Sequence, residues 1–102
     1  MNLAEALEFC ASADAAPAAP GAYILQIDLV QPLFVQMAGK FCAQLSAGRY
    51  LYCGSAKGPG GLRSRLARHM RHGKSMHWHI DQLTERGAVT GAWIMPTDEN
   101  AI

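Results

Sequence analysis

The stretch RYLYCGSAKGPGGLRSRLARHMRH, residues 49–72, decides the expected fold because it joins a strand to a helix. Its first residues are rich in tyrosine and leucine, which favour a β-strand. The glycine- and proline-rich residues 58–61 then predict a loop. Apolar residues recur every four positions from Leu62 onward, which predicts a helix over residues 62–72.

Shorter patterns on both sides of this stretch predict the remaining elements. They are strands at 21–30, 33–37, 41–45 and 87–95, a helix at 76–85 that Ser75 caps, and a third helix that begins near Pro96. The two short strands at 33–37 and 41–45 are expected to pair as a hairpin. The order of the elements therefore predicts an α+β fold, in which helices flank a small mixed or antiparallel β-sheet.

The first twenty residues are expected to form a helix and a linker. Apolar residues from Leu3 to Cys10 follow helical spacing and predict a helix over residues 2–11. The sequence AAPAAP at 15–20 breaks it, since proline removes a backbone donor and fixes φ. We therefore expect an N-terminal helix and linker at 1–20 without functional content, and one domain at 21–102 with an incomplete C-terminal helix.

Composition narrows the class of protein. The chain has 102 residues, of which 50% are apolar, and a formal net charge of +1, so it is typical of one folded domain. It contains no apolar run of the roughly 18 to 20 residues that a membrane helix needs. Its three cysteines have no CxxC spacing, which fits reduced thiols. These features predict a cytoplasmic protein with no membrane partner.

Positive charge is concentrated on the predicted 62–72 helix and its flanks. Between residues 57 and 74 there are six basic side chains and no acidic one: Lys57, Arg63, Arg65, Arg68, Arg71 and Lys74. Such a field attracts phosphate backbones, and the helix N-terminus after the glycine loop favours anions. A solvated basic face, or a surface for an acidic protein partner, would show the same pattern.

An ordered series of motifs in the sequence resembles a family of nucleases. The broad motifs are G-A-Y at 21–23, Y-C-G at 52–54 and R-x-x-x-H at 65–69, which resemble the GIY-YIG nuclease superfamily. The narrower motifs are GRYLYCGSA at 48–56, RSRLARH at 63–69 and HWHID at 77–81. These resemble the DUF123, or Uri-type endonuclease, branch, over about residues 21 to 95 of the chain.

The resemblance implies a metal-dependent endonuclease that hydrolyses phosphodiester bonds in DNA, with Mg²⁺ or Mn²⁺ as cofactor. It implies that Tyr23 and Tyr52 line the site and position or deprotonate the nucleophile. Arg65 corresponds to the arginine that stabilises charge on the scissile phosphate. His69 corresponds to a histidine that positions water or transfers a proton. Each tyrosine has an alternative interpretation as a half-buried aromatic residue of a strand.

Elementary chemistry agrees with these implied roles. Arginine offers a planar set of donors that cannot lose its charge at neutral pH, which suits a phosphate that gains negative charge. A histidine with an ordinary pKa can accept or donate a proton near pH 7. A phenol has a pKa of about 10, so a metal and an arginine would have to lower it before a tyrosine could act as a base.

The expected metal ligand is less well matched. The superfamily places a metal-binding glutamate on a helix after the last strand, and Glu99 is the only glutamate in that region. Without a carboxylate ligand, magnesium binds weakly and hydrolysis is crippled. An alternative is therefore a non-catalytic module that binds nucleic acid through the basic helix at 62–74.

The HWHID segment adds histidines close to the basic helix. Zinc is one interpretation, although no second ligand motif accompanies these histidines. In the structural interpretation Trp78 packs inward and Asp81 bonds to a histidine or an arginine of the basic helix. We expect His77 to contact nucleic acid together with the basic side chains Lys57, Arg63, Arg68, Arg71 and Lys74.

Overall fold

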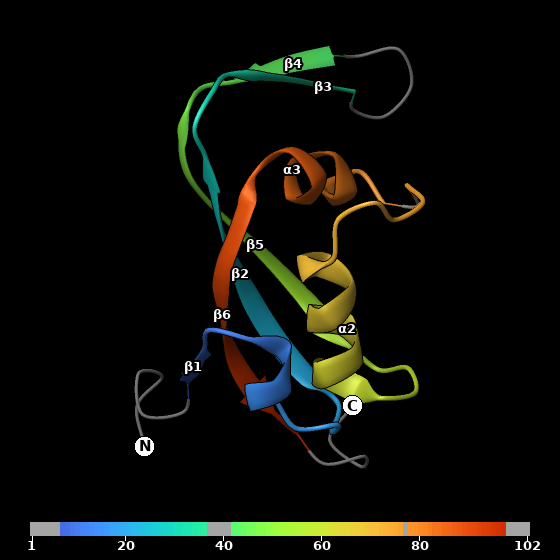
Figure 1. The fold of residues 1–102 in the computed structure, drawn as a ribbon. Helices are drawn as coiled ribbons and strands as arrows, with labels where there is room; N and C mark the ends of the chain where they lie inside the picture. Colours follow the sequence, from blue (N-terminus) through green and yellow to red (C-terminus); the bar gives the residue numbers. More distant parts are fainter. Residues whose placement is uncertain (1–6, 37–41, 77, 98–102) are drawn as a thin grey trace.

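The computed structural model describes residues 7–36, 42–76 and 78–97 (Figure 1). The strands are β1 (Glu8–Cys10), β2 (Gly21–Leu29), β3 (Leu33–Gln36), β4 (Cys42–Leu45), β5 (Gly48–Ala56) and β6 (Ala88–Pro96). The helices are the short 3-10 helix η1 (Ala13–Ala15), α2 (Gly61–Met70) and α3 (Ile80–Arg86). The predicted α+β class is confirmed, and the sheets are antiparallel.

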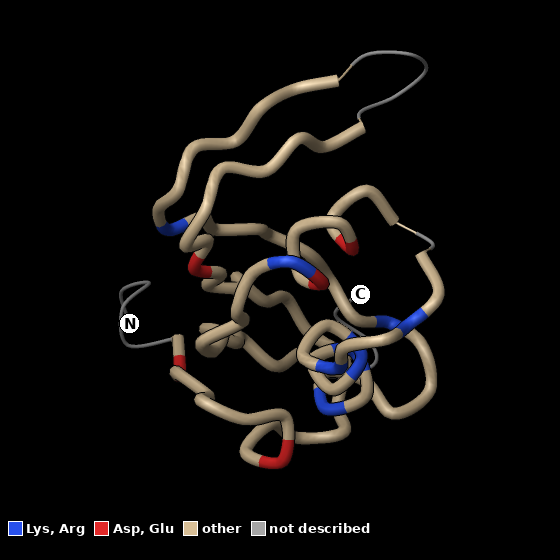
Figure 2. The backbone as a smooth tube through the Cα atoms, turned by 45° about the horizontal axis from the view of Figure 1, so that its top comes forward, with Lys and Arg blue, Asp and Glu red and all other residues tan. Residues whose placement is uncertain are grey.

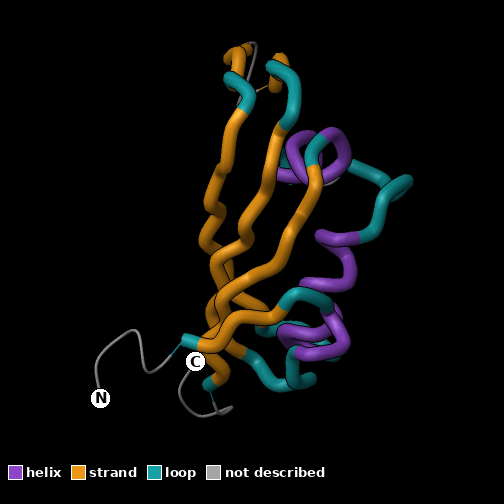
Figure 3. Tube along the Cα trace, turned by 60° about the vertical axis from the view of Figure 1, so that its left-hand side comes forward, coloured by secondary structure: helices purple, strands orange, loops and turns teal. Residues whose placement is uncertain are grey.

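The main sheet has four strands in the order β1-β6-β2-β5. The helices lie on one of its faces (Figure 3). Central strand β2 strictly alternates buried and half-buried residues, so one set of its side chains points to the helices. Leu25 and Ile27 of β2 meet Leu62 and Leu66 of α2 in the core, and all four are fully buried. The predicted apolar stripe of the basic helix therefore faces the sheet.

A two-stranded ribbon extends the fold beyond the main sheet. The chain leaves β2, runs through β3 and β4 and returns along β5, and β3 pairs with β4 in an antiparallel register (Figure 1). The predicted hairpin is thereby confirmed, and residues 37–41 at its turn lie outside the described part. Gln82 of α3 fastens the ribbon by accepting a hydrogen bond from Gln36 N and donating one to its carbonyl.

The predicted N-terminal helix is wrong over the residues that the structure describes. Residues Glu8–Cys10 form strand β1, which pairs with the edge of β6. The β6 edge offers a ladder of backbone donors and acceptors, and pairing with it outweighs the helical spacing of the apolar residues. Cys10 and Ala16 are almost fully buried in the same core as β2 and α2. The segment before β2 is thus part of the fold.

Two helix boundaries also differ from the prediction. Helix α2 ends at Met70 instead of residue 72, and Arg71 adopts extended geometry. Helix α3 begins at Ile80 instead of residue 76, and Ser75 does not cap it. The Asp81 carboxylate accepts the Trp78 N–H at 3.0 Å, so a carboxylate within the first turn of α3 anchors its entry. Pro96 ends β6, and residues 98–102, where a third helix was expected, lie outside the described part.

Candidate active site

A cavity of about 650 Å³ lies between β5, the middle of α2 and the start of α3. Its lining residues are Tyr23, Tyr52, Gly54, Ser55, Arg65, Trp78, His79 and Ile80. Three of the four residues expected to be catalytic line this cavity, and the fourth, His69, lies directly behind its wall. Strand and helix thus bring together side chains that are separated by up to 46 positions in the sequence.

Tyr23 and His69 form a buried pair at the inner wall. The Tyr23 hydroxyl lies 2.8 Å from His69 Nε2, and the two residues are 2% and 1% exposed. Gly54 makes room for the phenol, since a Cβ added there would lie 2.5 Å from the Tyr23 hydroxyl. The Tyr52 ring approaches His69 edge-on, with 6.1 Å between ring centroids. The absence of a side chain at the glycine of the Y-C-G motif therefore leaves space for the tyrosine of the G-A-Y motif.

The His69 position differs from the prediction. His69 was expected to position water or transfer a proton at the site, yet its ring is buried. Burial lowers the pKa of His69 to about 4, with the positive charges of Arg65 and Arg68 acting in the same direction. His69 is therefore neutral at pH 7. Its Nδ1 has no hydrogen-bond partner among the described residues.

Burial also acts on the Tyr23 phenol. It raises the pKa of Tyr23 above its ordinary value, while the nearby Arg65 guanidinium partly opposes the rise. Tyr23 could act as a base only if this pKa fell. Within the described residues, Tyr23 instead remains a neutral hydroxyl that can donate one hydrogen bond and accept others.

Arg65 occupies the rim of the cavity in a defined orientation. Its Nη1 donates to the carbonyl of Ser55 at 3.0 Å, and its guanidinium lies 4.9 Å from the centroid of the Trp78 ring. The hydrogen bond and the aromatic surface restrict the long side chain, while its other N–H groups remain able to reach a ligand. The geometry suits a preorganised anion contact at this rim.

Two of the predicted phosphate contacts have internal partners. Arg68 donates to both carboxylate oxygens of Asp81, at 2.8 and 2.9 Å, and Asp81 is fully buried. The Lys74 ammonium is buried, where it donates to the Arg71 carbonyl at 2.7 Å and pairs with Glu85 at 3.2 Å. These pairs join α2 and the following turn to α3. The expected bond between Asp81 and an arginine of the basic helix is confirmed.

The basic positions nevertheless gather on α2 and the segment after it (Figure 2). Lys57 and Arg71 are exposed and can reach a partner. Arg63 is also exposed, although its Nε donates to the Ala16 carbonyl. The positive surface is therefore smaller than the sequence suggests, because Arg68 and Lys74 neutralise acidic groups of α3.

The N-terminus of α2 does not present free amides to an anion as expected. Gly61 has a φ of +56°, and this left-handed turn brings the chain against the segment before β2. The backbone N–H groups of Leu62 and Arg63 donate to the carbonyls of Ala19 and Pro17, at 2.9 and 3.0 Å. Protein carbonyls thus satisfy these donors, and the helix N-terminus is capped from within the chain.

The described residues do not by themselves fit a divalent cation. No carboxylate lines the cavity within the described ranges, and Asp81, which follows the lining residue Ile80, is buried against Arg68. No group of three or more metal-ligating side chains occurs among the described residues, so the zinc interpretation gains no support there. Glu99 and His77 lie outside the described part of the chain.

Five lining residues of this cavity were not predicted as site residues: Gly54, Ser55, Trp78, His79 and Ile80. Trp78 was expected to pack inward, but it is 41% exposed and lies against the guanidinium groups of Arg65 and Arg68. Ser55 contributes a backbone carbonyl, and His79 is an exposed lining residue. All five positions belong to the motifs quoted above, but only the fold shows that they meet at one cavity.

The fold and the cavity together define a small α+β domain with a tyrosine, histidine and arginine centre. The family model described as "Domain of unknown function DUF123" matches residues 22–101, and the chain belongs to this family. No curated protein and no solved structure matches the chain. None of the described helices is long and apolar enough to cross a membrane.

Proposed function

We propose that the chain is a metal-dependent endonuclease of the GIY-YIG kind, which hydrolyses phosphodiester bonds in DNA at this cavity. The observation that carries the proposal is that Tyr23 and Arg65 line one cavity, while His69 bonds to Tyr23 from behind its wall. Arg65 meets a non-bridging oxygen of the scissile phosphate and stabilises the charge that develops there. Exposed Lys57 and Arg71 attract the backbone on either side.

Tyr23 positions the attacking water in this proposal. Tyr23 lines the cavity as a neutral phenol held by His69, and its oxygen accepts a hydrogen bond from water in this proposal. Tyr23 lines the cavity and His69 does not, so His69 acts through Tyr23 instead of touching substrate. In the tautomer with a proton on Nδ1, its Nε2 accepts the Tyr23 proton and fixes the direction of the hydroxyl. The magnesium or manganese ion expected from the family would require a ligand outside the described residues, such as Glu99.

A second candidate is a nucleic-acid-binding module without catalysis. The absence of a carboxylate from the described cavity lining favours it, because a magnesium ion needs hard oxygen ligands. The same rim of Arg65 and Trp78 would then bind a phosphate and a neighbouring base without cleavage. The two candidates share a binding surface and differ in whether a metal reaches it.

A plasmid-nicking assay with Mg²⁺ or Mn²⁺ tests the catalytic proposal. The wild-type chain is compared with Arg65→Ala and with Arg49→Ala, which removes an arginine that pairs with Asp28 at the far end of the sheet. We expect Arg65→Ala to lower the nicking rate by roughly 100-fold or more, as the loss of a group that stabilises developing charge does. Arg49→Ala should retain the rate.

Binding measured in parallel separates the two candidates. Wild-type nicking that disappears in Arg65→Ala supports the endonuclease. DNA binding that depends on Arg65 without any nicking supports the non-catalytic module. A chain that neither binds nor cleaves DNA, or equal losses in both variants, would contradict the site described above.

A further inference from the structure

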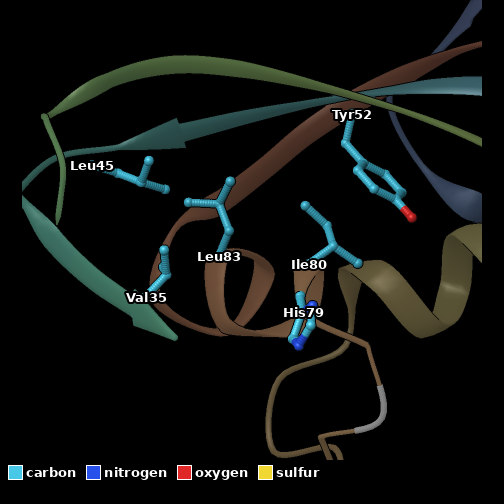
Figure 4. A pocket seen from close by; sticks show the side chains of 6 residues that line it. All are labelled: Val35, Leu45, Tyr52, His79, Ile80 and Leu83. Atoms are coloured by element: carbon cyan, nitrogen blue, oxygen red, sulfur yellow. The ribbon is translucent and has the colours of Figure 1, made fainter. Parts of the chain in front are cut away.

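A second, apolar cavity opens next to the candidate active site. It has a volume of about 240 Å³ and lies between the β3–β4 ribbon and α3 (Figure 4). Its lining residues are Val35, Leu45, Tyr52, His79, Ile80 and Leu83. Tyr52, His79 and Ile80 also line the larger cavity, so the two spaces adjoin and share one wall.

The two cavities differ in chemistry. The larger one carries Arg65, the Tyr23 hydroxyl and the Ser55 carbonyl, whereas aliphatic side chains and the rings of Tyr52 and His79 enclose the smaller one. Figure 4 shows the Tyr52 hydroxyl directed toward α2 and away from Val35 and Leu45. A ligand that spans both spaces therefore has an anionic part beside Arg65 and a flat apolar part beyond Tyr52.

The size of the smaller cavity limits that apolar part. Pockets for whole drug-sized molecules span about 300–1,000 Å³, so about 240 Å³ suits a single ring system. Aromatic rims and aliphatic walls are the surroundings that unstacked bases find in proteins that act on extruded or single-stranded nucleotides. In a nucleotide the base and the phosphate are close together, so the base can occupy the smaller cavity while the phosphate occupies the adjoining larger one.

We propose that the apolar cavity binds one unstacked nucleobase of the strand whose phosphate meets Arg65. The inference rests on the proposed function and specifies its substrate class as single-stranded or locally unpaired nucleic acid. The base stacks against Tyr52 and His79 and fills the space between Leu45 and Leu83. Because the walls of the cavity offer almost no hydrogen-bonding groups, any base fits and sequence preference is weak.

A binding experiment on the full chain tests the base pocket directly. Fluorescence anisotropy compares a single-stranded oligonucleotide, the same oligonucleotide with abasic sites throughout, and the duplex, in EDTA so that no cleavage occurs. We expect the abasic strand and the duplex to bind at least roughly fivefold more weakly than the base-bearing strand, since one stacked base contributes an effect of that size or more.

Two tryptophan variants on one strand locate the effect. Leu45→Trp fills the cavity, and Gln44→Trp places the same side chain on the opposite, exposed face of β4. Leu45→Trp should lower affinity for the base-bearing strand to the level of the abasic strand, while Gln44→Trp should leave it unchanged. Circular dichroism shows whether each variant is folded. If Leu45→Trp is unfolded, the comparison of base-bearing and abasic strands on the wild-type chain tests the base pocket alone.

The outcomes distinguish the two proposals. Tight binding that is equal for base-bearing and abasic strands would overturn the base pocket and leave the proposed function intact. Equal binding by Leu45→Trp and wild type would also overturn the pocket and identify the cavity as a packing gap. No binding to any strand would overturn both proposals.

Discussion

Burial of His69 beside Tyr23 makes the folding stability of the chain depend on pH. The pKa of His69 is about 4 in the folded chain against about 6.5 when it is exposed. Between these values the unfolded chain binds more protons than the folded one, so stability falls as pH falls from about 6.5 to about 4. The loss attributable to His69 approaches about 3 kcal/mol at the acid end.

Urea denaturation at several pH values measures this dependence. The variant His69→Gln lacks the titrating ring, so its stability should change less than that of the wild type between pH 4 and 6.5. Above pH 7 neither chain should show a contribution from residue 69. Parallel pH profiles for wild type and variant would show that His69 has the same pKa in the folded and unfolded states.

The Tyr23 hydroxyl has a separate test. Tyr23→Phe removes only the group that bonds to His69 Nε2, and it should lower stability by about 1–3 kcal/mol because a buried partner is left unpaired. Nicking should fall further while DNA binding persists. Tyr50→Phe is the matched control, since its hydroxyl bonds to the Ser46 carbonyl at an exposed position. Similar nicking rates in the two variants would argue against a catalytic role for Tyr23.

The residue scale also shows what the sequence could and could not predict. The motif that places a histidine four positions after Arg65 could be recognised in the sequence, and so could both tyrosines. The burial of His69 was not, because helical spacing alone treats a histidine as polar and cannot reveal a phenol on another strand that satisfies it. The sequence therefore predicts which residues form the site, and only the fold shows which of them are buried and which line the cavity.

Ion pairs join α2 and the turn that follows it to α3. The Arg68–Asp81 pair and the Lys74–Glu85 pair both cross this joint. Backbone N–H groups of Gly73 and Lys74, together with the Lys74 ammonium, lower the pKa of Glu85 to about 2. This joint holds Trp78 beside Arg65, so the electrostatics of two helices set the shape of the cavity rim.

Asp81→Asn tests this joint with a change that keeps the side chain's shape. Removing one partner of a buried ion pair costs about 3–5 kcal/mol, so we expect a large fall in the urea midpoint. Asp28→Asn is the matched control, because Asp28 accepts two bonds from Arg49 at an exposed position. Its midpoint should change far less. Equal shifts would mean that burial contributes nothing to the Arg68–Asp81 pair.

Element boundaries were predicted well where the pattern is local. The strand at 21–30, the hairpin and the basic helix all occur near their expected positions. Strand β1 was missed because its pairing with β6 joins residues more than 80 positions apart, and no local pattern contains that information. The late start of α3 was missed for a similar reason. Asp81 anchors the first turn of α3, and it is held in place by Arg68, which lies 13 positions earlier in the sequence.

At the scale of the whole molecule, internal ion pairs limit how strongly the protein can attract nucleic acid. Of six basic side chains on and around α2, Arg68 and Lys74 are committed to acidic partners. The remaining four contacts would give a log–log salt slope no steeper than about −3 for single strands. Anisotropy titrations at several salt concentrations measure this slope. A slope of about −4 or steeper would show that binding breaks the internal pairs.

The pairing of β1 with β6 has a consequence for anyone who trims the gene. The matched family region begins at residue 22, but a fragment cut there would lose the strand that covers the β6 edge. It would also lose the Pro17 and Ala19 carbonyls that cap α2. An uncovered edge strand is a template for intermolecular pairing and aggregation. The expression boundary that preserves this domain therefore lies upstream of Glu8, outside the span that family similarity marks.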